Sequence, residues 1–222
     1  MKVIDFSVGA GGPTRVFAEA GDEVITFQIN ARFDHPDTQT FMQLTAQDLL
    51  EKYGRPDFVW ASPPCVTFSV ASIGHHWTGG RRKYMPKTQA AVDNLLVVEH
   101  LRSLIEGLDP VRGFIIENPR GILRKLDVLD GLELRTVTYC SYGDTRMKPT
   151  DLWGSIPGWW PQDRCKPGDQ CHESAPRGSR TGTQALKTAS DRAHIPRALG
   201  EEIRAALEAV STTLPSGFLQ TK

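Results

Sequence analysis

The chain has 222 residues, enough for one α/β domain but not comfortably for two. Its 26 lysines and arginines balance 26 aspartates and glutamates, so any contact with nucleic acid must rest on local basic patches instead of an overall positive field. With neither a run of about 18 apolar residues nor a signal peptide, we expect a soluble cytoplasmic protein without a membrane partner, whose four cysteines are reduced.

The N-terminal elements predict the start of a doubly wound α/β sheet. A strand at 3–6 leads into a glycine-rich turn at 9–12, a helix at 14–20 that ends before Gly21, and a second strand at 23–29. Glycines in such a turn let the backbone approach a ligand that a side chain would block. This unit is typical of nucleotide-binding folds.

Two buried strands in the middle of the chain end in residues that carry chemistry. The strand at 57–61 is followed by Pro63, Pro64 and Cys65, and the strand at 113–116 by Glu117. Ligands bind at the carboxyl ends of strands in such a sheet, so a thiol and a carboxyl are delivered to one site. A glutamate that follows an apolar strand favours a raised pKa. Either motif alone could be a buried cysteine or a plain turn.

The remaining segments follow from spacing and composition. We expect a strand end and a helix within 42–53, a long loop at 66–85, a helix at 88–108, a strand at 134–140 and a final helix at 197–210. The long loop contains His75, His76, Trp77 and the basic run Arg81-Arg82-Lys83. These residues suit a clamp in which the basic run contacts DNA phosphates and Trp77 or a histidine wedges against bases. A solvated loop with scattered charges is the alternative.

Three stretches resemble the DNA (cytosine-5) methyltransferases, in particular their short bacteriophage homologues: 61–72, 114–121 and 139–150. The resemblance implies a Rossmann-like, S-adenosylmethionine-dependent methyltransferase sheet with helices on both faces. It also implies that Cys65 attacks C6 of a cytosine flipped out of double-stranded DNA, so that C5 can be methylated. Glu117 would contact N3, Asn118 would shape the pocket, and Arg146 or Lys148 would place a cation near the base.

The same resemblance implies two further groups of residues. The cofactor-binding group consists of Asp5, Phe6, Gly9, Gly11, Gln28, Gln43 and Pro63. The DNA-binding group consists of Ser69, Arg81, Arg82, Lys83, Lys148 and Arg177.

The cofactor positions depart from the family pattern. Gln28, Asn30 and Gln43 stand where carboxylates are usual. Three interpretations remain open: drift with ordinary S-adenosylmethionine, an altered donor such as a carboxylated derivative, which a less acidic pocket would repel less, or a non-catalytic base-flipping protein. A free nucleotide is an alternative substrate to DNA. The residues do not indicate which DNA sequence is recognised, what the biological role is, or which oligomeric state the protein has.

The expected division of the chain is a catalytic domain at 1–152, a short insert at 153–187 in place of a target-recognition domain, and a C-terminal helix at 188–222 that completes the catalytic domain. The insert contains Cys165, Cys171 and His172, which could hold zinc if Cys140 supplied a fourth ligand from outside. A glycine- and proline-rich loop with reduced cysteines and no metal is the alternative.

Overall fold

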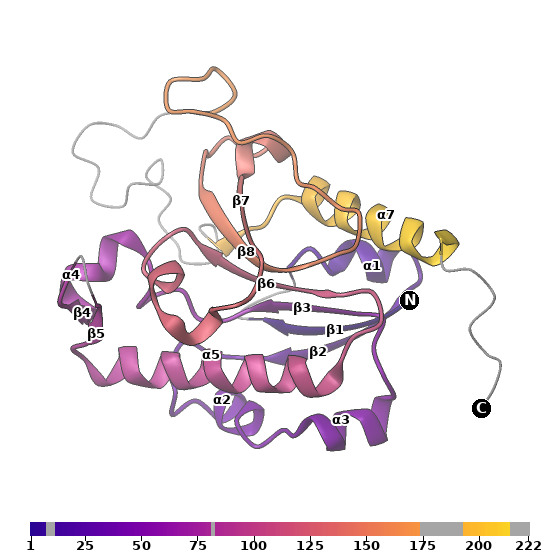
Figure 1. The fold of residues 1–222 in the computed structure, drawn as a ribbon, viewed down its shortest axis with the longest axis horizontal. Helices are drawn as coiled ribbons and strands as arrows, with labels where there is room; N and C mark the ends of the chain where they lie inside the picture. The colour runs from indigo at the N-terminus through magenta and orange to yellow at the C-terminus, as the bar shows by residue number, and fades with distance from the viewer. Residues whose placement is uncertain (8–11, 81–82, 174–192, 214–222) are drawn as a thin grey trace.

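A six-stranded sheet forms the centre of the computed structural model, which describes residues 1–7, 12–80, 83–173 and 193–213 (Figure 1). Its strands are β1 (Lys2–Ser7), β2 (Glu23–Gln28), β3 (Phe58–Ser62), β6 (Phe114–Pro119), β7 (Leu134–Thr138) and β8 (Pro149–Ser155). In the order β2-β1-β3-β6-β8-β7, the first four strands are parallel, and β8 runs antiparallel to both of its neighbours. The chain continues from β1 to β2 on one side and later to β3 on the other, so the predicted doubly wound sheet is confirmed.

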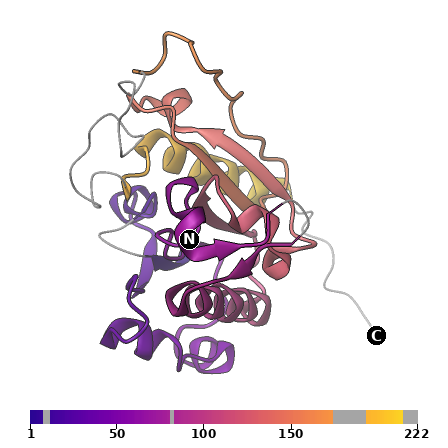
Figure 2. The same cartoon turned by 90° about the vertical axis from the view of Figure 1, so that its left-hand side faces the viewer.

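Helices cover both faces of the sheet (Figures 1 and 2). One face carries α5 (Gln89–Leu108), with α2 (Pro36–Phe41) and α3 (Ala46–Tyr53) beside it, and the other carries α1 (Arg15–Glu19) and α7 (Arg197–Thr213). Strand residues alternate between these faces. Ile4 and Phe6 of β1 belong to the core under α5, whereas Val3 belongs to the core under α7.

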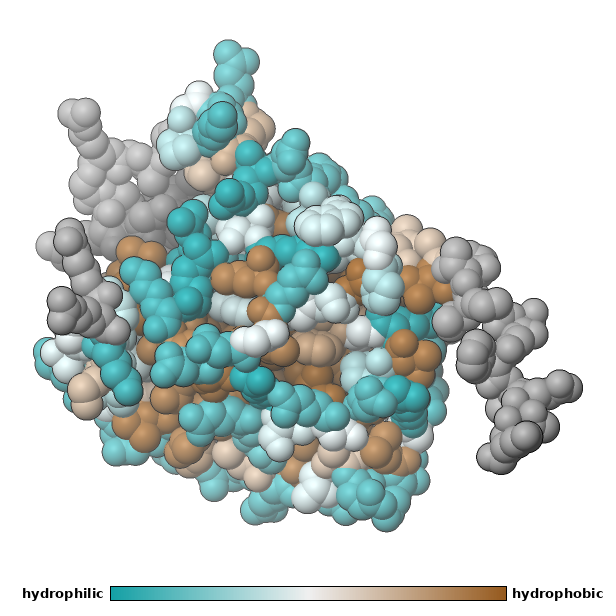
Figure 3. Space-filling model, in the orientation of Figure 1, coloured by the Kyte–Doolittle hydropathy of each residue, from teal (hydrophilic) through white to brown (hydrophobic). Residues whose placement is uncertain are grey.

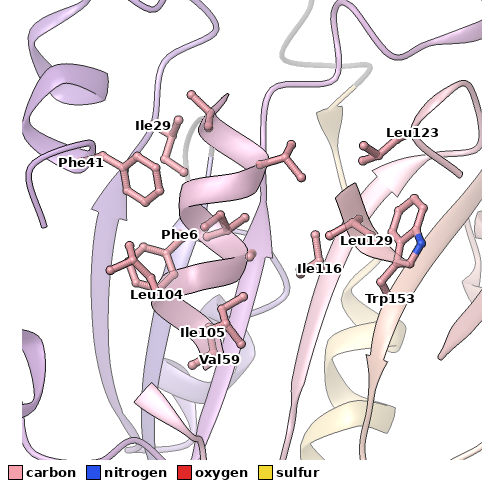
Figure 4. Close-up of a cluster of buried hydrophobic side chains, with 14 of the residues drawn as sticks. Phe6, Ile29, Phe41, Val59, Leu104, Ile105, Ile116, Leu123, Leu129 and Trp153 are labelled. Atoms are coloured by element: carbon pink, nitrogen blue, oxygen red, sulfur yellow. The ribbon is translucent and has the colours of Figure 1, made fainter. Parts of the chain in front are cut away.

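The larger core contains the side chains drawn in Figure 4. Phe6 stacks on Phe27 with ring centroids 5.4 Å apart and meets the edge of Phe41 at 5.8 Å. Helix α5 forms where its apolar spacing predicted. Thr88 caps its first turn by accepting a hydrogen bond from the Ala91 amide, which fixes where the helix begins.

The segment between β2 and β3 contains two helices, where the sequence predicted a strand end and one helix. Pro36 is the first residue of α2, and the His35 ring accepts a hydrogen bond from the Asp37 amide at 3.3 Å. Thr45 caps α3 by accepting from the Asp48 amide at 3.1 Å. The predicted strand end within 42–53 is therefore wrong, because residues 42–45 form the turn between two capped helices.

The predicted loop at 66–85 contains regular structure among its described residues. It includes η1 (Val70–Ser72), α4 (Ile73–His76) and the antiparallel strands β4 (Trp77–Thr78) and β5 (Met85–Pro86). Trp77 is buried, and its Nε1 donates to the Thr67 carbonyl at 2.7 Å. A role for Trp77 as a wedge between DNA bases is therefore wrong, because its ring packs against Phe68 in the core.

Two boundaries near the end of the sheet differ from those expected. Strand β7 ends at Thr138, and the following residues form the short 3-10 helix η4 (Tyr139–Tyr142). Two more 3-10 helices, η2 (Leu123–Lys125) and η3 (Asp127–Leu129), lie between β6 and β7. Strand β8 continues through Ser155, which pairs with Phe114, so the sheet extends past the expected domain boundary at 152.

Hydrophilic and apolar side chains are interspersed over the face in Figure 3, in keeping with the balanced charge. Within the described ranges, every helix is too short or too polar to cross a membrane.

Candidate active site

Polar residues occupy one row across the carboxyl ends of four neighbouring strands, at the edge of the molecule that faces the viewer in Figure 2. Ser7 of β1 pairs in register with Gln28 of β2 and with Ser62 of β3. Glu117 of β6 continues the row, because the residue before it, Ile116, pairs with Ala61. The row crosses the junction between β1 and β3 where the sheet changes winding direction, the position at which such sheets bind ligands.

Glu117 is buried, with 5% of its surface exposed. Burial raises its pKa, as the sequence predicted, while the nearby Lys148 cation and hydrogen bonds from Tyr139 and Ser62 oppose the shift. The Tyr139 hydroxyl donates to Glu117 Oε1 at 3.0 Å, which fixes one carboxyl oxygen. A carboxyl group in this setting is protonated more readily than an exposed one, so it can donate a proton to a bound ligand.

Cys65 lies in the loop that follows β3, and its side chain is half-buried. The loop is fastened to β6 because Asn118 Nδ2 donates to the Pro63 carbonyl at 3.1 Å. The Cys65 carbonyl accepts from the amides of Phe68 and Ser69, both at 3.1 Å, which closes a tight turn after the thiol. These bonds place Cys65 beside the strand that carries Glu117.

Close backbone contact holds the far side of this loop against the segment after β6. The Ile122 amide donates to the Phe68 carbonyl at 2.8 Å. A Cβ atom at Gly121 would lie only 2.1 Å from that carbonyl oxygen, so a glycine is required there. The two predicted motifs are thus joined by their backbones.

Lys148 and Arg146 occupy different environments. Lys148 Nζ lies 4.6 Å from the centre of the Tyr139 ring, and burial lowers its pKa while Glu117, Cys65 and Asp144 oppose that shift. Arg146 is buried and pairs with Asp144, with Nε 2.8 Å from Oδ1, and also donates to the His194 carbonyl at 3.3 Å. Lys148 therefore acts electrostatically on both Cys65 and Glu117. The sequence analysis had offered Lys148 both as the cation near the base, as the alternative to Arg146, and as a DNA contact.

The side chains of Asp5 and Phe6 are buried and contact other residues of the fold. Asp5 is fully buried and accepts hydrogen bonds from the hydroxyls of Ser7 and Thr14, so it ties β1 to the start of α1. Burial raises the pKa of Asp5, an effect that these two hydrogen bonds oppose. The Phe6 side chain is buried in the aromatic core, and its contact with a cofactor stays a prediction.

The other predicted cofactor residues are divided between surface, interior and undescribed positions. Gln28 and Gln43 are exposed, and Pro63 is buried beneath the Cys65 loop. Gly9 and Gly11 lie outside the described residues. A Cβ atom at the neighbouring Gly12 would come within 3.1 Å of Trp60 Nε1, so the backbone at Gly12 lies close to β3.

The predicted DNA-binding residues are only partly described. Ser69 is half-buried and pairs with Gly121, and Lys83 is exposed. Arg81, Arg82 and Arg177 lie outside the described residues. Sequence reasoning missed two exposed apolar side chains beside the thiol, Val66 and Val70, which are 49% and 68% exposed. An apolar residue in a cysteine loop gives no signal of exposure until the fold is known.

The insert brings its candidate metal ligands together with Cys140. The ligand atoms of Cys140, Cys165, Cys171 and His172 all lie within 4.8 Å of one another. Cys140 is buried on η4, and the other three are half-buried or exposed. The sequence had named Cys140 as the possible ligand from outside the insert.

No family model matches the chain. A curated relative, the probable DNA (cytosine-5)-methyltransferase of Frog virus 3 (isolate Goorha), is 33% identical over 116 residues. The match covers 52% of this chain and 53% of the relative, so the aligned part spans about half the length of each protein.

Two solved structures were matched to part of this chain. One is a mutant of Spodoptera frugiperda DNMT2, at 20% identity and a TM-score of 0.40, where 74% of this chain covers 53% of that chain. The other is the Entamoeba histolytica methyltransferase EhMeth, at 12% identity and a TM-score of 0.44, where 74% of this chain covers 56%. The resemblance to the DNA (cytosine-5) methyltransferases that the motifs predicted is therefore confirmed by the sequence match to the viral relative.

Proposed function

We propose that this protein is a DNA (cytosine-5) methyltransferase that uses Cys65 as its nucleophile and Glu117 as its proton-exchanging acid. The observation that carries this proposal is the grouping of Cys65, Glu117 and Lys148 at the carboxyl edge of the sheet, with Lys148 acting electrostatically on both partners. A cation beside a cysteine favours the thiolate, the reactive form. A target base inside a duplex must be flipped out to reach these groups.

The chemistry follows from the two side chains. The Cys65 thiolate adds to C6 of cytosine while N3 takes a proton from the Glu117 carboxyl, so the electron pair of the C5–C6 bond becomes available at C5. After C5 is methylated, a base takes the C5 proton, the electron pair of that C–H bond forms the C5–C6 double bond again, and the C6–S bond breaks to release the Cys65 thiolate. Glu117 then recovers its proton from N3. Lys148 offsets the negative charge shared between the thiolate and the carboxylate.

The residues at the sheet edge fit S-adenosylmethionine, which supplies the methyl group when bound. Gln28, exposed at the end of β2, offers an uncharged donor and acceptor for the hydroxyl and amino groups of such a ligand. Asn118 Oδ1 is a buried oxygen without a hydrogen-bond partner among the described residues, so it remains an acceptor beside the Cys65 loop.

The identity of the donor is tested at Gln28. Because Gln28 is exposed at the end of β2, a carboxylate there can reach the same ligand groups without repacking the core. If ordinary S-adenosylmethionine is the donor, Gln28→Glu changes its affinity little. If the variant binds S-adenosylmethionine much more tightly, the amide is poorly suited to the ordinary donor, and an altered donor is favoured.

The proposal is tested by mass spectrometry of nucleosides from the DNA of cells that express the protein. We expect 5-methylcytosine with the unchanged chain and none with Cys65→Ala. A heavier cytosine adduct that depends on Cys65 would support the chemistry with a modified donor. Unmodified DNA in both cultures, with soluble folded protein, would contradict the proposal and favour a nucleotide substrate or a non-catalytic binder.

A further inference from the structure

We propose that Cys140, Cys165, Cys171 and His172 bind one structural Zn²⁺ ion, which fastens the segment 162–173 to the wall of the candidate active site. Three thiols and one imidazole form a complete tetrahedral ligand set of the kind that structural zinc sites use. Such a site leaves no open coordination position, so the ion would stabilise the fold and take no part in the chemistry.

The distances between the ligand atoms suit a single ion. With zinc–sulfur bonds of about 2.3 Å and zinc–nitrogen bonds of about 2.05 Å, tetrahedral geometry sets sulfur atoms about 3.8 Å apart and sulfur about 3.6 Å from nitrogen. Cys171 Sγ lies 3.6 Å from Cys140 Sγ and 3.5 Å from His172 Nδ1, and Cys165 Sγ lies 3.6 Å from His172 Nδ1. Cys140 and Cys165 are closer, with their sulfur atoms 2.9 Å apart.

A disulfide is the competing arrangement for the closest pair. A disulfide bond brings two sulfur atoms to about 2.05 Å, well below the 2.9 Å between Cys140 and Cys165. It would also leave Cys171 and His172 without a reason to converge on the same point. A shared ion accounts for all four side chains.

Hydrogen bonds between backbone groups of residues 162–165 and side-chain hydroxyls of residues 138–142 position Cys165. The Cys165 amide donates to Thr138 Oγ1 at 3.0 Å, and Ser141 Oγ donates to the Asp163 carbonyl at 2.9 Å. The Gln162 amide donates to the Tyr142 hydroxyl at 3.0 Å. These bonds hold the start of the segment along η4, so Cys165 meets Cys140.

A tight turn returns the chain to the same point. Lys166 to Asp169 form a turn closed by a 3.1 Å bond from the Asp169 amide to the Lys166 carbonyl. Pro167 and Gly168 occupy its central positions, and Gly168 has a φ of 97°, as a type II turn requires. The turn reverses the chain and brings Cys171 and His172 back beside Cys165.

The segment has little else to hold it. Its residues from Gln162 to Glu173 are polar apart from the two cysteines, Pro167 and Gly168, and most are exposed. Fixing such a backbone costs conformational entropy that no apolar burial offsets here. Metal binding supplies folding free energy in small segments of this kind.

The proposed ion adjoins the candidate catalytic residues through the chain itself. Cys140 directly follows Tyr139, whose hydroxyl donates to Glu117. On the other side, the Glu173 amide donates to the Thr145 carbonyl at 2.9 Å, next to Arg146. Loss of the ion should therefore loosen both the insert and the wall behind Glu117.

The test measures zinc in the full-length protein, purified under reducing conditions. We expect about one zinc per chain in the unchanged protein. The matched control is Cys65→Ser, since Cys65 is the remaining cysteine of the four, and it should keep its zinc. Cys140→Ser and Cys171→Ser should lose zinc, and His172→Cys, which rebuilds a four-ligand set, should retain it while His172→Ala does not.

A second measurement keeps the proposal testable if the cysteine variants fail to fold. The unchanged protein, stripped with a chelator and titrated with Co²⁺, should show the ligand-field and thiolate-to-metal absorption of a tetrahedral site, and Zn²⁺ should abolish it. Its thermal stability should fall on stripping and return with Zn²⁺. A folded, metal-free protein with a Cys140–Cys165 disulfide, or zinc retained equally by Cys171→Ser and the Cys65→Ser control, would overturn the proposal.

Discussion

Asn118 provides a test of how the fold positions the nucleophile. Its side chain is fully buried and makes one hydrogen bond, from Nδ2 to the Pro63 carbonyl at 3.1 Å. Asn118→Leu keeps a similar volume but leaves the Pro63 carbonyl without this donor, which costs about 1–3 kcal/mol of unfolding free energy. For a chain of this size, each kcal/mol lowers the melting temperature by roughly 2–4 °C.

The same change should reduce methyl transfer more than it reduces stability. A displacement of about 1 Å in a reacting group can lower the rate about 100-fold. The matched control is Asn94→Leu, which removes another 3.1 Å bond, from Asn94 Nδ2 to Thr67 Oγ1 in the same loop. Thr67 is also held by Trp77, so we expect a comparable loss of stability and a smaller loss of rate.

Asn118→Asp adds a dependence on pH. Burial raises the pKa of the introduced carboxyl in the folded state, and its protonated form can donate to the Pro63 carbonyl as the amide did. The variant should therefore approach the stability of the unchanged protein below about pH 3.9, and lose stability as the pH rises through the raised pKa. Thermal melts across pH, paired with methyl-transfer rates at fixed pH, measure both effects. If Asn118→Leu melts and reacts like the unchanged protein, the bond to Pro63 does not hold the Cys65 loop in place.

Three further predictions concern separate parts of the molecule. Glu117→Gln should lower methyl transfer by about 10²- to 10⁴-fold in steady-state assays while DNA binding is kept. Burial raises the Glu117 pKa, so the favourable contribution of this residue to stability is present below about pH 4.3 and is lost as the pH rises through the raised pKa. Glu117→Gln should therefore be relatively more stable than the unchanged protein at neutral pH. Melting curves of the two proteins with the same pH dependence would refute this. Trp77→Ala should cost about 3–5 kcal/mol in denaturant unfolding, because the ring is buried, and a variant as stable as the parent would contradict its place in the core. Lys83→Ala should make the dependence of DNA affinity on salt shallower by about 0.9 in the log–log slope, and an unchanged slope would exclude a phosphate contact.

The sequence predicted the parts of the fold that depend on local pattern. The spacing of apolar residues located α5 almost to the residue, and the prolines and glycines around β3 and β6 located the strand ends that carry Cys65 and Glu117. The helix α2 escaped prediction because Pro36 resembles a helix breaker, whereas at the first helical position its fixed φ favours the helix.

Long-range contacts account for what the sequence could not show. Trp77 lies among polar residues in the chain, and only its contact with Phe68 and Thr67 reveals that it is buried. The place of Lys148 beside Cys65 and Glu117 depends on β8 running antiparallel to β6, which no local pattern indicates. Cys140 and Cys165 meet because η4 and the insert fold onto each other, although the residue types alone had suggested a shared ion.

Covalent trapping tests the central claim most directly. In duplex DNA that contains 5-fluorocytosine, fluorine replaces the C5 proton that must leave, so an adduct between Cys65 and C6 cannot be released. With S-adenosylmethionine present, the account predicts a denaturation-resistant protein–DNA complex whose peptide map places the link at Cys65, and no complex for Cys65→Ala. The absence of a complex with the folded, unchanged protein, or a link at another residue, would contradict the assignment of Cys65 as the nucleophile.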